Sequence, residues 1–97
     1  MNVDLAGRLV IIIGGGVVAE RKVRGILAFD AEVAVRVIAP AMTDVLRELA
    51  DSGQIEWREE RYAGGMLEGA FLVYAATDSP SVNAEVAAEA KRLGLLV

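Results

Sequence analysis

Three consecutive glycines, Gly14 to Gly16, lie between a run of aliphatic residues and a stretch with helical periodicity. With Ala19 they form the pattern G-x-G-x-x-A. In such a loop Gly14 permits a tight turn from strand to helix, and Gly16 lacks the Cβ that would keep a pyrophosphate from the backbone. Ala19 is small enough for close packing of the helix on the strand. The helix N-terminus offers N–H groups and a positive dipole end to an anion. This spacing favours dinucleotide binding.

A glycine turn with a purely structural role is the alternative, since this motif alone is weak evidence. Here it follows a predicted strand and opens a predicted helix, which is the context that dinucleotide binding requires. Arg21, Lys22 and Arg24 lie in the first turns of that helix. Cations are unfavourable there unless anions occupy the site. They are equally well explained as solvated side chains on an outer face.

Hydrophobic periodicity predicts the elements around this loop. Apolar or alternating runs predict strands over residues 9–13, 32–38, 55–58 and 71–76. Apolar residues at helical spacing predict three helices, with core faces formed by Ala19, Val23, Ile26 and Leu27, by Met42, Val45, Leu46 and Leu49, and by Val82, Val86, Ala90 and Leu93. The first helix is expected to end near Phe29 or Asp30, because Asp tolerates a left-handed cap. Residues 95–97 resemble the opening of one more strand.

Strands that alternate with helices predict an α/β fold with a mainly parallel sheet and right-handed crossovers. With the glycine motif, this order indicates a three-layer Rossmann-like fold with strand order 3-2-1-4-5, the last strand being cut short. A chain of 97 residues has room for one domain only. We therefore expect residues 1–97 to form one NAD(P)-binding Rossmann domain.

The loops that follow the apolar strands, at residues 14–18, 39–42 and 77–79, are expected to meet at the carboxyl ends of a parallel sheet, where ligands bind. The small residues of the 39–42 loop leave room for an adenosine. Thr77 and Asp78 are suited to hydrogen-bond a ligand, although Asp78 serves equally well as a helix cap.

Composition excludes several classes of chemistry. The chain has no Cys and no His, which removes thiolate nucleophiles, His general bases and Cys/His metal sites. No carboxylates have metal-binding spacing, so no metal site is predicted. The net charge of -4 argues against a general nucleic-acid binder. No signal peptide or membrane-spanning run is predicted, and we expect a soluble, cytoplasmic protein.

The choice between NAD and NADP is open at this stage. NAD-binding folds commonly place an acid about 20 residues after the glycines to bind the adenine ribose. The corresponding stretch, residues 36–40, contains none. Arg36 in the same stretch would suit a 2'-phosphate, but a surface arginine that extends its charge to solvent is the simpler interpretation.

Several motifs together resemble one known family. They are G-G-G-x-V-A-x-R-K at residues 14–22, A-E-V and A-P between residues 31 and 40, A-A-T-D at residues 75–78, and V-N at residues 82–83. They are similar to the NAD-binding domain of precorrin-2 dehydrogenases, including the N-terminal part of siroheme synthase. The resemblance extends from about Asp4 to Val97.

The resemblance implies both a site and an activity. The implied contacts to the pyrophosphate and nearby ribose are Gly14, Gly15, Gly16, Val17 and Val18. Pro40 and Ala41 would line the adenosine side, and Thr77 would approach the nicotinamide half. Family members oxidise precorrin-2, a tetrapyrrole, to sirohydrochlorin with NAD as hydride acceptor, and many also help to insert iron.

The family's catalytic Asp would fall just beyond Val97, so no catalytic residue is assigned within this chain. We therefore expect the chain to be the N-terminal part of a longer enzyme, inactive alone and able to form a homodimer. The alternative is a regulatory module that binds NAD(H) without catalysis.

Overall fold

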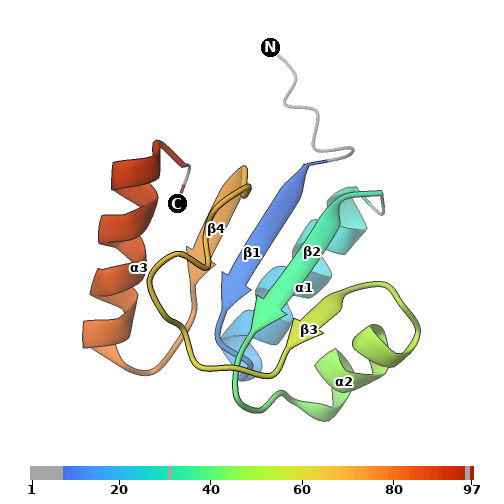
Figure 1. Ribbon diagram of the computed structural model, residues 1–97. Helices are drawn as coiled ribbons and strands as arrows, with labels where there is room; N and C mark the ends of the chain where they lie inside the picture. The colour runs from blue at the N-terminus through green and yellow to red at the C-terminus, as the bar shows by residue number, and fades with distance from the viewer. Residues whose placement is uncertain (1–7, 31, 96) are drawn as a thin grey trace.

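Four parallel strands and three helices make up the chain in a computed structural model, which describes residues 8–30, 32–95 and 97 (Figure 1). The elements in chain order are β1 (Leu9–Ile13), α1 (Val17–Phe29), β2 (Ala34–Ile38), α2 (Asp44–Asp51), β3 (Glu56–Arg58), β4 (Leu72–Ala75) and α3 (Pro80–Leu93). The strand order is β3-β2-β1-β4, and each neighbouring pair is parallel. The α/β fold and the order 3-2-1-4 are confirmed.

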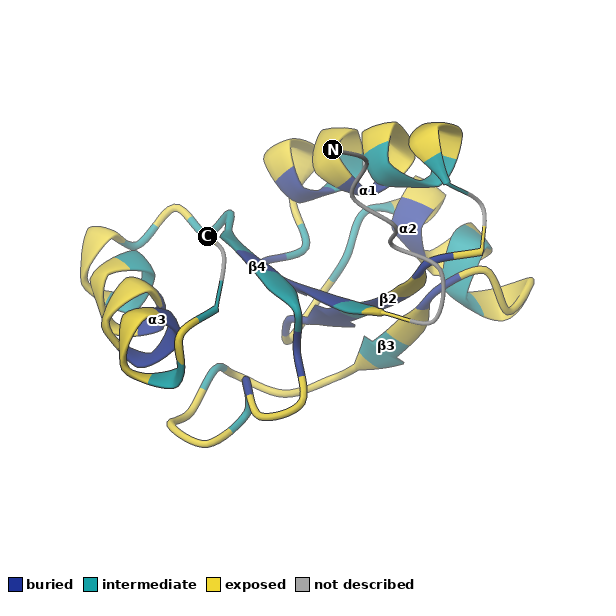
Figure 2. Cartoon of the chain, turned by 90° about the horizontal axis from the view of Figure 1, so that it is seen from above, coloured by how far each residue is buried: buried dark blue, intermediate teal, exposed yellow. Residues whose placement is uncertain are grey.

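The sheet is covered on both faces, which gives three layers (Figure 2). Helices α1 and α2 pack on one face around Val10, Ile12 and Val37. Helix α3 and the segment between β3 and β4 pack on the other face around Ile11, Ile13 and Val73. Alternate residues of β1 therefore enter opposite cores, which explains why this strand is apolar at every position.

The ends of the helices follow from local sequence. Thr43 caps α2, because its Oγ1 accepts a hydrogen bond of 3.2 Å from the backbone N–H of Leu46. Ser79 caps α3 in the same way, with Pro80 in the first turn. Gly94 ends α3 with a φ of 73°, the left-handed conformation that glycine adopts most easily. These starts and stops were predictable from residue type.

Three details of the sequence prediction are wrong. Residues 32 and 33 precede β2 instead of belonging to it, and β3 and β4 are likewise shorter than predicted. Asp30 follows α1 in an extended conformation, with φ -151°, instead of forming a left-handed cap. Its Oδ1 accepts a hydrogen bond from the Glu32 N–H, which favours this turn. Val45 is 37% exposed, so the core face of α2 is narrower than its periodicity indicated.

The fifth strand expected over residues 95–97 falls partly on Leu96, which lies outside the described residues. Leu95 and Val97 do not belong to a strand. Leu95 instead packs beside the α3 core, and its N–H donates to the carbonyl oxygen of Ala90.

Candidate cofactor-binding site

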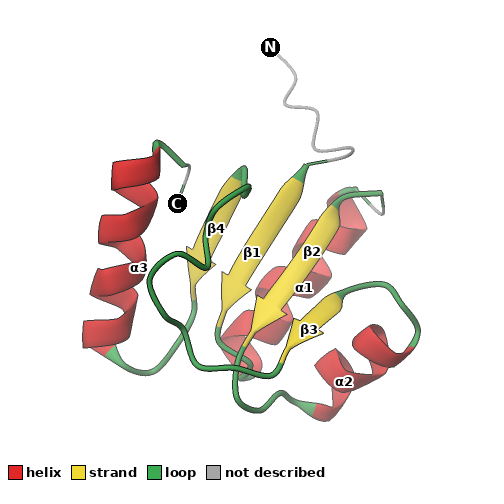
Figure 3. Ribbon diagram, in the orientation of Figure 1, coloured by secondary structure: helices red, strands yellow, loops and turns green. Residues whose placement is uncertain are grey.

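One large cleft, of about 1020 Å³, lies at the carboxyl ends of the strands. The three loops predicted to form a crevice all line it, and Figure 3 shows them following the arrowheads of β1, β2 and β4. All eight residues implied by the family resemblance line this cleft: Gly14, Gly15, Gly16, Val17, Val18, Pro40, Ala41 and Thr77. The structure thus brings together residues that are more than 60 positions apart in sequence.

Gly14 and Gly15 are required by packing. Gly14 is buried and has a φ of +128°, and a Cβ there would lie 2.4 Å from the carbonyl oxygen of Ala76. A Cβ on Gly15 would lie 2.0 Å from the carbonyl oxygen of Ala41. Both contacts are with backbone, so a side chain at either position would force the neighbouring loop to move. These two glycines bring the three loops into close contact.

Gly16 is different because a Cβ at this position would have no atom within 4 Å, so this side of the residue is open. It is the N-cap of α1, with φ -89°, and no side chain caps this helix. The first N–H groups of a helix have no partner inside the helix. In α2 and α3 a hydroxyl meets one of them, whereas in α1 no side chain does and the first residues, Gly16 to Val18, line the cleft. This is the arrangement expected of an anion site.

The loop at residues 39–43, which forms one side of the cleft, is held by hydrogen bonds to β3 and to the glycine loop. The Trp57 indole N–H donates to the carbonyl oxygen of Ala39 at 2.9 Å. The Thr43 N–H donates to the carbonyl oxygen of Gly15, also at 2.9 Å. Trp57 of β3 therefore fixes the loop that carries Pro40 and Ala41.

Thr77 is fixed by Asn83 of α3. The side-chain oxygen of Asn83 accepts hydrogen bonds from the Thr77 hydroxyl at 2.6 Å and from the Thr77 N–H at 3.2 Å. The Asn83 amide donates to the Thr77 carbonyl oxygen at 3.0 Å. This network explains the V-N motif, because Asn83 orients the loop that approaches the β4 side of the cleft. Ser79, not Asp78, caps the helix, and Asp78 lines the cleft.

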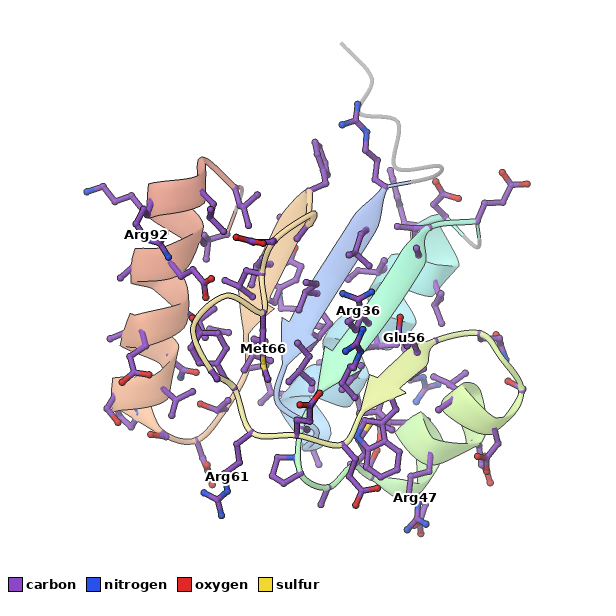
Figure 4. All side chains as sticks on the ribbon, viewed as in Figure 1. Arg36, Arg47, Glu56, Arg61, Met66 and Arg92 are labelled. Carbon is purple, nitrogen blue, oxygen red and sulfur yellow. The ribbon has the colours of Figure 1, made fainter. Side chains whose placement is uncertain are left out.

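Sequence reasoning missed a fourth wall of the cleft. Arg61 and Tyr62, from the segment between β3 and β4, also line it. In Figure 4 Arg61 projects beyond the end of the sheet where the strands terminate. The only sequence signal was an aromatic residue beside a basic one in the connection between two predicted strands. The long connection that brings them to the cleft is not visible as a local pattern.

Tyr62 is anchored by Glu89 of α3. The Tyr62 hydroxyl donates a hydrogen bond to the Glu89 Oε1, and the Gly65 N–H donates to Oε2 at 2.7 Å. Burial raises the pKa of the Tyr62 phenol well above its usual range, and the hydrogen bond and negative charge of Glu89 raise it further. Tyr62 therefore stays protonated at neutral pH and continues to donate to Glu89.

The basic residues near the glycine loop do not line the cleft. The Lys22 Nζ lies 4.8 Å from the centre of the Tyr74 ring, and an Arg24 nitrogen lies 4.0 Å from a Glu20 oxygen. Arg21, Lys22 and Arg24 are all exposed. The structure favours the interpretation of these cations as solvated side chains on an outer face.

Arg36 also lies away from the cleft. Its Nε donates to the Glu56 Oε1 at 3.1 Å, and Arg58 donates to the other oxygen of the same carboxylate at 2.9 Å. Both hydrogen bonds lower the pKa of the Glu56 carboxyl, and the one from Arg58 has the larger effect. Arg36, Arg58 and Met66 line a second cavity of about 280 Å³ on the α3 side of the sheet, and Figure 4 labels Arg36 together with its partner Glu56.

Neither a metal centre nor a membrane-spanning helix is found in the described part of the chain. Residues 8–30, 32–95 and 97 contain no group of three or more potential metal-ligating side chains. None of the three described helices is long and apolar enough to cross a bilayer.

The fold and the cleft define a dinucleotide-binding domain of the Rossmann type. Residues 1–97 match the family model described as "Putative NAD(P)-binding", and the chain belongs to this family. It is 42% identical over 93 residues to siroheme synthase 1 of Serratia proteamaculans, and the aligned region covers 96% of this chain and 19% of the relative. It is 44% identical over 87 residues to siroheme synthase of Chromobacterium violaceum, and the aligned region covers 90% of this chain and 18% of the relative.

A solved structure, that of SirC, precorrin-2 dehydrogenase, has the same fold. The TM-score is 0.82 at 30% sequence identity, over 90% of this chain and 43% of that chain. The chain spans about a fifth of the length of the siroheme synthases that it matches.

Proposed function

We propose that this chain is the cofactor domain of an NAD-dependent precorrin-2 dehydrogenase, an oxidoreductase of siroheme and porphyrin biosynthesis. The observation that carries the proposal is the open side of Gly16 at the N-terminus of α1, which no side chain caps. The family, the relatives and the SirC fold support the same assignment.

Each candidate residue has a role in the proposed complex. The N–H groups of Gly16, Val17 and Val18 face the diphosphate, because the first turn of a helix binds anions. Gly14 and Gly15 allow the loops to approach one another. Pro40 and Ala41 line the adenosine side, and the Thr77 loop lies beside the nicotinamide half.

NAD is favoured over NADP. Of the cleft-lining residues, Arg61 is the one cation that the structure describes, and it follows β3 and not β2. The adenine ribose binds near the end of the second strand, where an NADP enzyme places an arginine. Arg36, the only arginine in β2, is paired with Glu56 and lines the other cavity.

When bound, NAD supplies a hydride acceptor. The contribution of this chain to the reaction is to hold the nicotinamide carbon against the substrate, which provides proximity and orientation. The substrate, precorrin-2, carries carboxylates, and Arg61 at the rim of the cleft attracts such anions. We assign no catalytic residue within the chain. The proposal includes a cytoplasmic location and a homodimer.

Calorimetric titration of the chain with NAD and NADP tests the binding step. We expect NAD to bind, NADP to bind more weakly, and Gly16→Asp to lower the NAD affinity at least about tenfold. Trp57 is the only tryptophan and contacts the cleft wall, so NADH bound in the cleft should quench its fluorescence. Unchanged NAD affinity in Gly16→Asp would refute the site.

The dehydrogenase and the regulatory module both bind NAD, but only the dehydrogenase oxidises precorrin-2. Precorrin-2 oxidation, followed by absorbance in the full-length protein, separates them. Oxidation that depends on NAD supports the dehydrogenase, whereas NAD binding without oxidation supports the module.

A further inference from the structure

The segment from Glu59 to Phe71 connects the two edges of the sheet. It leaves β3 at one edge and enters β4 at the other, so it runs along the α3 face and past the cleft (Figure 1). Tyr62 is half-buried in this segment, and it both lines the cleft and packs against the core beneath α3. A single aromatic ring thus connects the ligand cleft with the interior.

Glu89 holds this segment in place. It is 5% exposed and is the one buried charged side chain in the described part of the chain. A buried carboxylate is unfavourable unless it is hydrogen-bonded. Both Glu89 oxygens meet donors of the segment, namely the Tyr62 hydroxyl and the Gly65 N–H, and Arg92 lies 3.8 Å from Oε2. The carboxylate therefore ties the segment to α3 at two points.

Tyr62 lies on the nicotinamide side of the cleft. Like Tyr62, Ala75 at the end of β4 and Val82 in the first turn of α3 pack against the core beneath α3 and line the cleft. The adenosine side is at the opposite end, after β2, where Rossmann folds bind the adenine ribose. The glycine loop lies between these two ends, because β1 lies between β2 and β4 in the sheet. A dinucleotide that spans the cleft places its nicotinamide next to Tyr62 and Thr77.

We propose that the ring of Tyr62 contacts the nicotinamide half of the cofactor and that Glu89 is its positioning residue. This inference rests on the proposed function. Because the Tyr62 hydroxyl is bonded to Glu89, the contribution is packing of an aromatic face and not proton transfer. Aromatic rings pack favourably against one another beyond the area that they bury.

Calorimetry with NADH and with ADP tests this proposal, because ADP contains only the adenosine and diphosphate half. For Tyr62→Leu we expect NADH affinity to fall about three- to tenfold and ADP affinity to stay within about twofold of the wild type. Tyr62→Phe, which keeps the ring but loses the hydrogen bond to Glu89, should have an NADH affinity between those of Tyr62→Leu and the wild type. Glu89→Gln, which keeps the tyrosine but weakens its anchor, should also weaken NADH binding less than Tyr62→Leu does, and it leaves the glycine loop untouched.

The outcomes are distinguishable. If the wild type binds neither NADH nor ADP, the proposed function fails and the inference fails with it. If the wild type binds both and Tyr62→Leu weakens neither, or weakens both equally, only the inference is overturned.

A second measurement uses the wild type and so does not depend on folding of the variants. Nuclear Overhauser contacts are expected between the nicotinamide protons and the Tyr62 ring. Contacts from the adenine protons to Pro40 without any from the nicotinamide to Tyr62 would overturn the proposal.

Discussion

Gly15 and the carbonyl group of Ala41 approach one another so closely that a Cβ on Gly15 would lie 2.0 Å from the Ala41 oxygen. The carbonyl oxygen of Gly15 also accepts a hydrogen bond from the Thr43 N–H. The glycine loop and the loop after β2 are therefore one packed unit. Consequently the three consecutive glycines should respond differently to substitution.

Gly15→Ala should destabilise the fold, because backbone atoms of the Ala41 loop must move to admit the methyl group. Overpacking of this kind typically costs about 1–3 kcal/mol. Urea denaturation followed by circular dichroism measures the change in the free energy of unfolding. Gly16→Ala is the matched control, since its methyl group would meet open space, and a similar loss of stability in both variants would contradict the described packing.

Gly16→Asp should separate stability from binding. An aspartate at the N-cap accepts a hydrogen bond from the first turn and favours the helix dipole, so stability should be unchanged or raised by about 0.3–1 kcal/mol. The same charge repels a diphosphate, and NAD affinity should fall at least about tenfold. Thermal denaturation and calorimetry measure the two effects.

Gly16→Asn provides the neutral comparison for this variant. It caps the helix without the charge, so it should retain more NAD affinity than Gly16→Asp while it matches or exceeds the stability of the wild type. A stabilised Gly16→Asp with wild-type affinity would place the diphosphate elsewhere.

Asn83→Ala should release Thr77 from α3. It removes the acceptor of the Thr77 hydroxyl and N–H and the donor to the Thr77 carbonyl oxygen. The loss of half-buried hydrogen bonds should lower the free energy of unfolding by about 1–3 kcal/mol. Amide hydrogen exchange should increase at Thr77 but not at Thr43, the cap of α2. Unchanged exchange at Thr77 would contradict this role of Asn83.

Tyr62→Phe should lower stability at neutral pH, because Glu89 loses one donor; this typically costs about 1–3 kcal/mol. The raised pKa of Tyr62 predicts the pH dependence. The Tyr62 phenol stabilises the fold as long as it is protonated in both the folded and the unfolded protein. This contribution is lost as the pH rises from about 10, the pKa of tyrosine in the unfolded chain, toward the higher pKa of the folded protein.

The difference in stability between wild type and Tyr62→Phe should therefore shrink above about pH 10. Urea denaturation across this range measures it. Tyr74→Phe, which removes the other tyrosine hydroxyl, is the control. A difference that stays constant up to strongly alkaline pH would show that the Tyr62–Glu89 hydrogen bond does not contribute as described.

Much of this architecture was predictable because its signals are local. The doubly buried β1, the glycine turn, and the caps at Ser79 and Gly94 each follow from residue type and spacing. The meeting of three loops at one cleft follows from the rule that parallel strands share their carboxyl ends.

What sequence reasoning missed depends on long-range contacts. Tyr62 enters the cleft because Glu89, 27 positions away, anchors it. Trp57 fixes Ala39 across 18 positions. The second predicted strand begins with a polar and an apolar residue, Glu32 and Val33, in a strand-like pattern, yet the Asp30 side chain holds Glu32 in a turn. Local periodicity carries no information about such partners.

A crystal structure of the chain with NAD bound tests the central claim most directly. We expect the diphosphate oxygens within hydrogen-bond distance of the N–H groups of Gly16 and Val17, the adenosine beside Pro40 and Ala41, and the nicotinamide next to Tyr62. A diphosphate bound away from the first turn of α1, with this cleft empty, would contradict the account.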